Sequence, residues 1–415
     1  MSSSAFNFAA AAANGWRAVR DQTSCTLQAG VLITICLLSW VTYNFFFHPL
    51  SKYPGPRACA VSTLPFALWL VRGKFPLMIH RLHEEYGEVV RIAPNKLSYI
   101  SSQAWQDIAG ARKHGQLEMP KDPRWYCQGA NGPDIVNCDQ VTHRRFRKAF
   151  AHGFSDRSLR LQEPLIQQHI TVLIDQLTRC VLRGEPMVNV VKWMECALFD
   201  MTGDLTFGET FDCLETGNLH PWFQDIFGVI RAWVLFRLAQ EMMPEAMLKY
   251  AIPLTQRLMS HDKVKKYLEH EAFTRDKLVR RMSRQNDPEQ VSDLLDPILR
   301  KPPGERMTFA ELLSNSFVFI LAGGETTASA LSAMLYLLLS NPKKMKNLVV
   351  ALETAFPREE MITIETTSQI PYLHAVIEES LRLYPPIPSG SPRCVPKGGA
   401  MIDRQYLPEG VSFLS

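Results

Sequence analysis

The six residues from Ala322 to Thr327, AGGETT, interrupt the most apolar internal helix that the sequence predicts. That helix should span 308–340, because Thr308 and Glu311 have the spacing of a capping box and Asn341-Pro342 stops a helix. Its apolar middle is expected to be buried. Two glycines and a carboxylate weaken such a helix locally, which indicates that something large or flat approaches the backbone there while polar groups handle protons. A second membrane helix kinked at Gly-Gly is the alternative, but a mid-membrane charge costs about 3 kcal/mol.

Toward the amino terminus, an uncharged run predicts a membrane anchor. Residues 27–47, LQAGVLITICLLSWVTYNFFF, would span roughly 30 Å as a helix, which is the thickness of the bilayer hydrocarbon. A short segment, 1–26, precedes the run. The run therefore begins too late in the sequence to be a cleaved signal peptide. A buried core helix is the other alternative. The sequence HPLSKYPGP at 48–56 predicts a stiff, proline-rich hinge between the anchor and the body.

Basic residues on either side of this run predict its orientation. Arg17 and Arg20 precede it, and four basic residues follow it, at Lys52, Arg57, Arg72 and Lys74. Positively charged flanks favour the cytosolic side. The sequence therefore predicts a single-pass anchor with the bulk of the chain in the cytosol.

The rest of the chain, 57–415, is expected to form one mainly α domain with small β-sheets. Most of its segments carry apolar residues at helical spacing. Two β-rich runs in 87–100, separated by Pro94-Asn95-Lys96, predict a hairpin. The tail 392–415 is rich in proline, glycine and β-branched residues, which predicts short strands and turns.

Composition excludes several classes of protein. The formal net charge is only +4 over 415 residues, so no nucleic-acid partner is expected. Nine cysteines form no C-x-x-C pair, which argues against zinc fingers and disulfide scaffolds and favours a reducing compartment. The common P-loop, G-x-S-x-G, H-E-x-x-H and G-x-G-x-x-G motifs are absent from the sequence.

A second constellation follows the central helix. Glu379 and Arg382 form E-x-x-R on one predicted helix face, and Arg393 follows in a Pro-Arg pair. Upstream, His143 and Arg147 are four residues apart in a basic helix. Together with AGGETT, the order of these motifs resembles the cytochrome P450 family, the haem-thiolate monooxygenases. Segments 193–208 and 220–222 are similar to fungal secondary-metabolism members, nearest to trichothecene-pathway hydroxylases of the isotrichodermin hydroxylase type.

The resemblance implies a mainly α cytochrome P450 fold behind a transmembrane helix, with haem b as cofactor. Thr326 would hold dioxygen and a water, and Glu325 would relay protons from solvent. Ala322 and Gly323 would line the haem, with Gly323 and Gly324 leaving room for dioxygen and substrate.

The family likeness also assigns the charged residues. Arg147 and Arg393 would bind the haem propionates and His143 would add a donor. Glu379 and Arg382 would form a buried structural pair. The basic residues Arg144, Arg145 and Lys148 would be either a docking face for an acidic reductase or a solvated cationic face.

The implied activity is oxidation or hydroxylation of an apolar small molecule at the endoplasmic reticulum membrane. Its electrons would come from NADPH through NADPH-cytochrome P450 reductase.

The family's haem-ligand cysteine loop, F-x-x-G-x-x-x-C-x-G, is not found in this sequence, and Cys394 has the wrong neighbours for it. No protein metal ligand is therefore assigned. The chain is expected to be truncated before that loop, as a shortened gene model, a pseudogene product or a non-catalytic anchored protein. As written, it should bind haem poorly and be inactive. The alternative functions are a catalytically inactive P450 remnant and a protein that binds an apolar ligand without redox chemistry.

Overall fold

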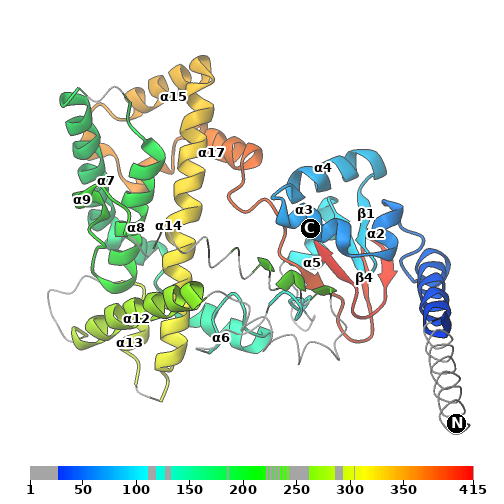
Figure 1. Ribbon diagram of the computed structural model, residues 1–415. Coiled ribbons are helices and arrows are strands. Elements are labelled where there is room, and N and C mark those ends of the chain that lie inside the picture. Colours follow the sequence, from blue (N-terminus) through cyan, green and yellow to red (C-terminus); the bar gives the residue numbers. More distant parts are fainter. Residues whose placement is uncertain are drawn as a thin grey trace, which may run out of the picture. The chain divides into compact units, whose positions relative to one another are not determined.

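The computed structural model describes residues 27–110, 118–126, 132–184, 187–220, 261–285, 293–302 and 304–414, with scattered positions between 223 and 242. The predicted segment 1–26, with Arg17 and Arg20, lies outside the described residues. The chain divides into two compact units. Unit 1 is Met1–Met119 with Ser391–Ser415, and unit 2 is Pro120–Gly390. Each is described by itself (Figure 1).

Unit 1 holds the amino-terminal helix and every strand among the described residues. Its helices are 27–42, η1 (Tyr43–Phe47), α2 (Arg57–Val61), α3 (Leu64–Val71), α4 (Phe75–Tyr86) and α5 (Ser102–Ala109). Its strands are β1 (Val89–Ala93), β2 (Lys96–Tyr99), β3 (Arg393–Cys394), β4 (Ala400–Ile402), β5 (Gln405–Leu407) and β6 (Ser412–Leu414).

The strands confirm the predicted hairpin and the predicted β-rich tail. β1 and β2 pair antiparallel, with Val89 opposite Tyr99. The tail returns to this hairpin, because β6 pairs parallel to β2, and β3 pairs antiparallel to β6. The four-stranded order is β1-β2-β6-β3, and β4-β5 is a separate hairpin.

The end of the amino-terminal helix is fastened to unit 1. Trp40 Nε1 donates to the Val61 carbonyl at 2.9 Å, and the buried Arg91 donates through Nη1 to the Asn44 carbonyl at 2.9 Å. The proline-rich segment 48–56 is packed as well, since Leu50 within it is fully buried. Two described helices, Leu27–Phe47 and Phe309–Leu339, are long and apolar enough to cross a membrane.

The elements of unit 2 among the described residues are all helices. Its helices are α6 (Gln140–Phe150), α7 (Asp156–Leu182), α8 (Val190–Phe207), α9 (Cys213–Thr216), α12 (His261–Ser283), α13 (Asp296–Leu299), α14 (Phe309–Leu339), α15 (Pro342–Ala355), η2 (Glu359–Met361), α16 (Ile364–Thr367) and α17 (Pro371–Leu383). Figure 1 shows α14 as the long helix of this unit, beside α8.

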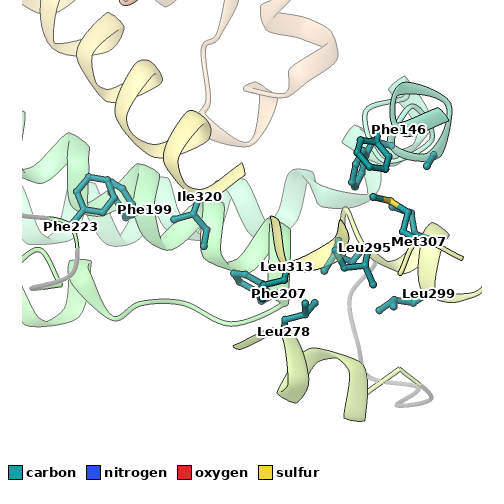
Figure 2. Close-up of a cluster of buried hydrophobic side chains, with 14 of the residues drawn as sticks. Phe146, Phe199, Phe207, Phe223, Leu278, Leu295, Leu299, Met307, Leu313 and Ile320 are labelled. Carbon is teal, nitrogen blue, oxygen red and sulfur yellow. The ribbon is translucent and has the colours of Figure 1, made fainter. Parts of the chain in front are cut away.

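The core of unit 2 lies where α6, α8, α12 and α14 meet. It is built from aromatic and aliphatic side chains, among them Phe146, Phe207, Leu278, Leu313 and Ile320, all nearly or fully buried (Figure 2). This cluster packs α14, which carries Ala322–Thr327, against α8 and against α6, which carries His143 and Arg147.

Candidate active site

The sequence correctly predicts the ends of α14. Thr308 is its N-cap, its side chain accepts from the Glu311 N–H, and the Glu311 carboxylate accepts from the Thr308 N–H, so the capping box is complete. Ser340 is the C-cap. The expectation that the apolar middle is buried all round is wrong, because only the Ile320, Gly324 and Ala328 positions around it are buried. The face with Ala322 and Thr327 is exposed within unit 2.

The two glycines of AGGETT let α8 approach α14 closely. A Cβ at Gly323 would lie 2.9 Å from Thr202 Oγ1, and one at Gly324 would lie 2.6 Å from Phe199 Cζ. The space that the missing side chains leave is therefore filled by α8, which corrects the expectation that it accommodates dioxygen and substrate. The physical reason is packing, since a side chain here would push two core helices apart.

Thr326 and Glu325 lie next to this contact and differ in how their polar atoms are satisfied. The Thr326 hydroxyl donates to the Ala322 carbonyl at 2.6 Å, so its lone pairs remain able to accept. Glu325 Oε1 accepts from Ser329 Oγ at 3.4 Å, whereas Oε2 is buried without a partner. Burial raises the pKa of the Glu325 carboxyl, and the hydrogen bond from Ser329 offsets part of the rise. The pair thus joins a carboxyl that keeps its proton to higher pH than an exposed glutamate would to a hydroxyl that can accept one hydrogen bond.

Helix α6, which carries His143 and Arg147, is tied to the amino-terminal turn of α14. Arg145 forms a two-point ion pair with Glu311, with one contact of 3.2 Å between Nη1 and Oε2. Next to α6, the Ile135 N–H donates to Asn315 Oδ1 on α14 at 2.9 Å. Arg145 is thus engaged within unit 2, which weakens the alternative that places it on a reductase-docking face.

His143 and Arg147 differ in exposure on α6. Arg147 is exposed, and among the described residues it has no hydrogen-bond or ion-pair partner. His143 is half-buried. An unpaired guanidinium on a helix that is fastened to α14 is suited to an anionic group such as a carboxylate.

The E-x-x-R pair forms, but on the surface. Arg382 Nε and Nη2 donate to the two oxygens of Glu379 at 2.7 and 2.8 Å, and the two side chains are 66% and 57% exposed. The expectation of a buried pair is wrong in unit 2 as described, because α17 contacts α14 but leaves both of these side chains exposed. In this setting water screens the two charges, so the pair contributes little to stability.

Arg393 belongs to unit 1. It lies on β3 opposite Phe413 of β6, and its Nη1 donates to the Met119 carbonyl at 3.3 Å. The candidate residues on α6, α14 and α17 all belong to unit 2.

Comparison with known proteins decides the family. The family model for cytochrome P450 matches residues 55–414, a range that runs through both units. The chain belongs to the cytochrome P450 family. Its mainly α fold with small sheets is the fold expected from the sequence.

Several curated P450s from fungi are similar to it. The cytochrome P450 monooxygenase astJ of Aspergillus oryzae is 39% identical over 375 residues, which are 90% of this chain and 73% of that protein. Averantin hydroxylase of Dothistroma septosporum is 36% identical, over 95% and 73% of the two chains. Versicolorin B desaturase stcL of Emericella nidulans is 36% identical, over 92% and 76%. The chain is therefore an oxidoreductase of fungal secondary metabolism, while the narrower likeness to trichothecene-pathway hydroxylases stays a prediction.

A P450 implies haem, and the residues of unit 2 fit one side of it. Ala322 and Thr327 leave an exposed face of small side chains on α14, and the orphaned Glu325 oxygen lies beside it. Two buried cysteines on or next to α8, Cys196 and Cys213, are unsuited to bind the iron as thiolates. Burial raises the pKa of Cys196 to about 11 and of Cys213 to about 12, so both stay protonated thiols. Among the described residues no group of three or more His, Cys, Asp or Glu is placed to hold a metal ion.

Sequence reasoning missed three residues of this site. Ser329 bonds Glu325 one turn away, a signal that the i, i+4 spacing contains. Asn315 on α14 binds Ile135 in the segment before α6, and Arg145 on α6 binds Glu311 of α14, across 180 and 166 residues of sequence, and no local pattern indicates such contacts.

Proposed function

We propose that this P450 inserts oxygen into an apolar small molecule of a fungal biosynthetic pathway, using dioxygen and electrons from NADPH delivered by a reductase. The observation that carries the proposal is the Glu325–Thr326 pair on α14, which lies next to the exposed positions Ala322 and Thr327. Haem, when bound, supplies the activation of dioxygen.

The chain's own residues supply proton control. Glu325 is half-buried with one oxygen unpartnered, so it retains a proton to higher pH than an exposed glutamate would. The Thr326 hydroxyl donates its only proton to the Ala322 carbonyl, so toward any other group it acts as an acceptor. The two groups can therefore hold a water between them and pass a proton toward the Ala322 face.

Cofactor and membrane contacts complete the proposal. Arg147, without a partner in the described part of unit 2, would bind a haem propionate, with His143 beside it on α6, and Arg393 would bind propionate from unit 1. Haem b, the endoplasmic reticulum membrane and a cytosolic catalytic domain, 57–415, belong to the same proposal. The apolar helix 27–47 supports the anchor and the basic residues after it support the orientation.

Chromosomal alleles in the fungus test this function. Deletion of the gene should cause accumulation of a metabolite one oxygen atom poorer than the product. Thr326→Ala and Glu325→Gln at the native locus should reproduce most of that accumulation, whereas Lys346→Gln on the exposed face of α15 should not. Unchanged metabolites in the deletion strain, or full product from Thr326→Ala, would contradict oxygen chemistry at α14.

A further inference from the structure

The interface between α8 and α14 brings a second carboxylate toward Glu325. Phe199 meets Gly324 and Thr202 meets Gly323, so residue numbers rise on α8 as they fall on α14 and the two helices are antiparallel. Glu195 precedes Phe199 by four residues and Thr202 by seven, and side chains at these spacings lie on one helix face. Glu195 therefore extends the same contact by one turn, past Gly324 toward the carboxyl half of α14.

The facing part of α14 is polar. Glu325, Ser329 and Ser332 follow one another at i, i+4 and i+7, so they share a face. Ser329 donates to Glu325, whereas Ser332 Oγ and Glu325 Oε2 are buried without partners. A buried polar row with unsatisfied atoms is a place where a water or a shared proton satisfies them.

Basic residues on α8, α12 and α17 are engaged with other partners. Lys192 donates to Asn218, Lys277 pairs with Glu209, Arg281 with Asp293, and Arg382 with Glu379, while burial lowers the pKa of His270 to about 3 and keeps it neutral. Burial raises the pKa of both Glu195 and Glu325, and the charge of Glu325 raises that of Glu195 further. No cation among the described residues lowers the pKa of Glu195 or of Glu325.

We propose that Glu195 and Glu325 form one titrating pair across the α8–α14 interface, with Glu195 as the positioning residue that keeps a proton available to Glu325. The inference rests on the proposed function for its role in oxygen chemistry, but the pair itself does not. Two close carboxyls that lack a cation share their titration, so removing one changes the behaviour of the other.

Urea unfolding of the full chain in detergent tests the pair without haem. A carboxyl whose pKa is raised in the folded state contributes stability at low pH, and this contribution is lost as pH rises through the folded pKa. At about pH 8, Glu195→Gln and Glu325→Gln should therefore each raise the urea midpoint, and the double variant should gain less than the sum. Near pH 4 the variants should agree with the parent. Glu378→Gln, on the exposed face of α17, is the control and should show no pH-dependent gain.

The outcomes separate the pair from the function. Additive gains at about pH 8 would overturn the pair. In the fungus, Glu195→Gln should reduce the amount of oxygenated product several-fold. This reduction should be smaller than the one that Glu325→Gln causes. Product loss without coupled titration would overturn the pair and leave the function standing. Coupled titration in a protein whose deletion leaves metabolites unchanged would support the pair and overturn the function.

Discussion

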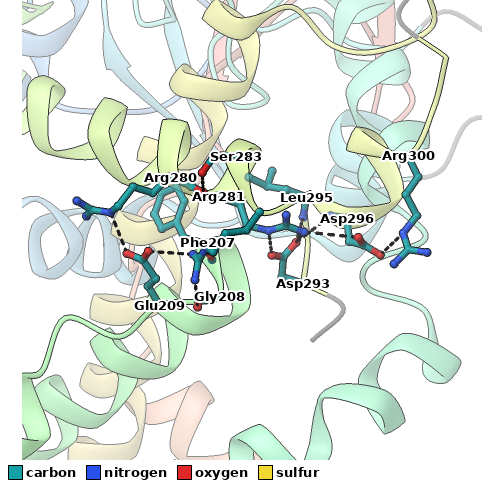
Figure 3. Close-up of polar contacts among 11 residues, drawn as sticks. Phe207, Gly208, Glu209, Arg280, Arg281, Ser283, Asp293, Leu295, Asp296 and Arg300 are labelled. Carbon is teal, nitrogen blue, oxygen red and sulfur yellow. Dashed lines mark hydrogen bonds and ion pairs between the residues drawn. The ribbon is translucent and has the colours of Figure 1, made fainter. Parts of the chain in front are cut away.

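Substitution of Arg281 by Met tests the energetics of unit 2 most directly. Arg281 is fully buried on α12, where Nε and Nη2 bind Asp293 and Nη2 also lies 3.5 Å from Asp296 Oδ1 (Figure 3). Removing one member of a buried ion pair costs about 3–5 kcal/mol, because the remaining charge is left without its partner.

The structure places the expected loss at the lower end of that range. Asp293 keeps two backbone donors, the N–H groups of Leu295 and Asp296 at 3.0 and 2.8 Å. Asp296 keeps Arg300 at 2.8 Å. We therefore expect Arg281→Met to lower the free energy of unfolding by about 3 kcal/mol, or about 1 M in urea midpoint at an m value near 3 kcal/mol/M.

Urea unfolding followed by far-ultraviolet circular dichroism measures this loss, and the neighbouring residue gives the matched control. Arg280 pairs with Asp276 and Glu209, but its side chain is 47% exposed, so Arg280→Met should cost less than about 1 kcal/mol. Burial already raises the pKa of Asp293, and loss of Arg281 should raise it further. The deficit of Arg281→Met should then shrink as pH falls, because Asp293 can become neutral. Equal losses for the two variants would refute the reasoning.

Three further predictions concern contacts around α8 and α17. Gly324→Ala should destabilise the chain by about 1–3 kcal/mol in urea unfolding, since its Cβ would collide with Phe199; Gly184→Ala, where nothing lies nearby, tests backbone strain alone. Asp200→Ala should cost about 3 kcal/mol or more, because the buried carboxylate accepts three backbone N–H groups of the loop after α8; a loss under about 1 kcal/mol would contradict this. Glu379→Gln should leave the urea midpoint almost unchanged at any pH, because both partners are exposed, and a clear drop in the midpoint would contradict this.

The features that the sequence predicts well are those whose causes are local. The capping box of α14 needs only Thr308 and Glu311, and the hairpin of β1 and β2 needs only alternation around a turn. The features that it misses depend on partners far along the chain. Gly323 and Gly324 are conspicuous in the sequence, but only the packed helices show that α8 fills their space. Burial of Glu379 and Arg382 was inferred from the family, and no spacing within α17 could test it.

The attachment of the amino-terminal helix constrains the motion of unit 1. With Trp40 bonded to Val61 and Asn44 bonded to the buried Arg91, the helix cannot rotate about its own axis without breaking contacts in the sheet-bearing unit. Both hydrogen bonds are 2.9 Å long and lie near the same end of the helix, so that end is fixed to unit 1 while the rest of the helix extends from it. A change in the tilt of residues 27–42 would therefore act on β1 through the hydrogen bond between Asn44 and Arg91. Replacing Arg91 would remove one of these two attachments and leave the helix held through Trp40 alone.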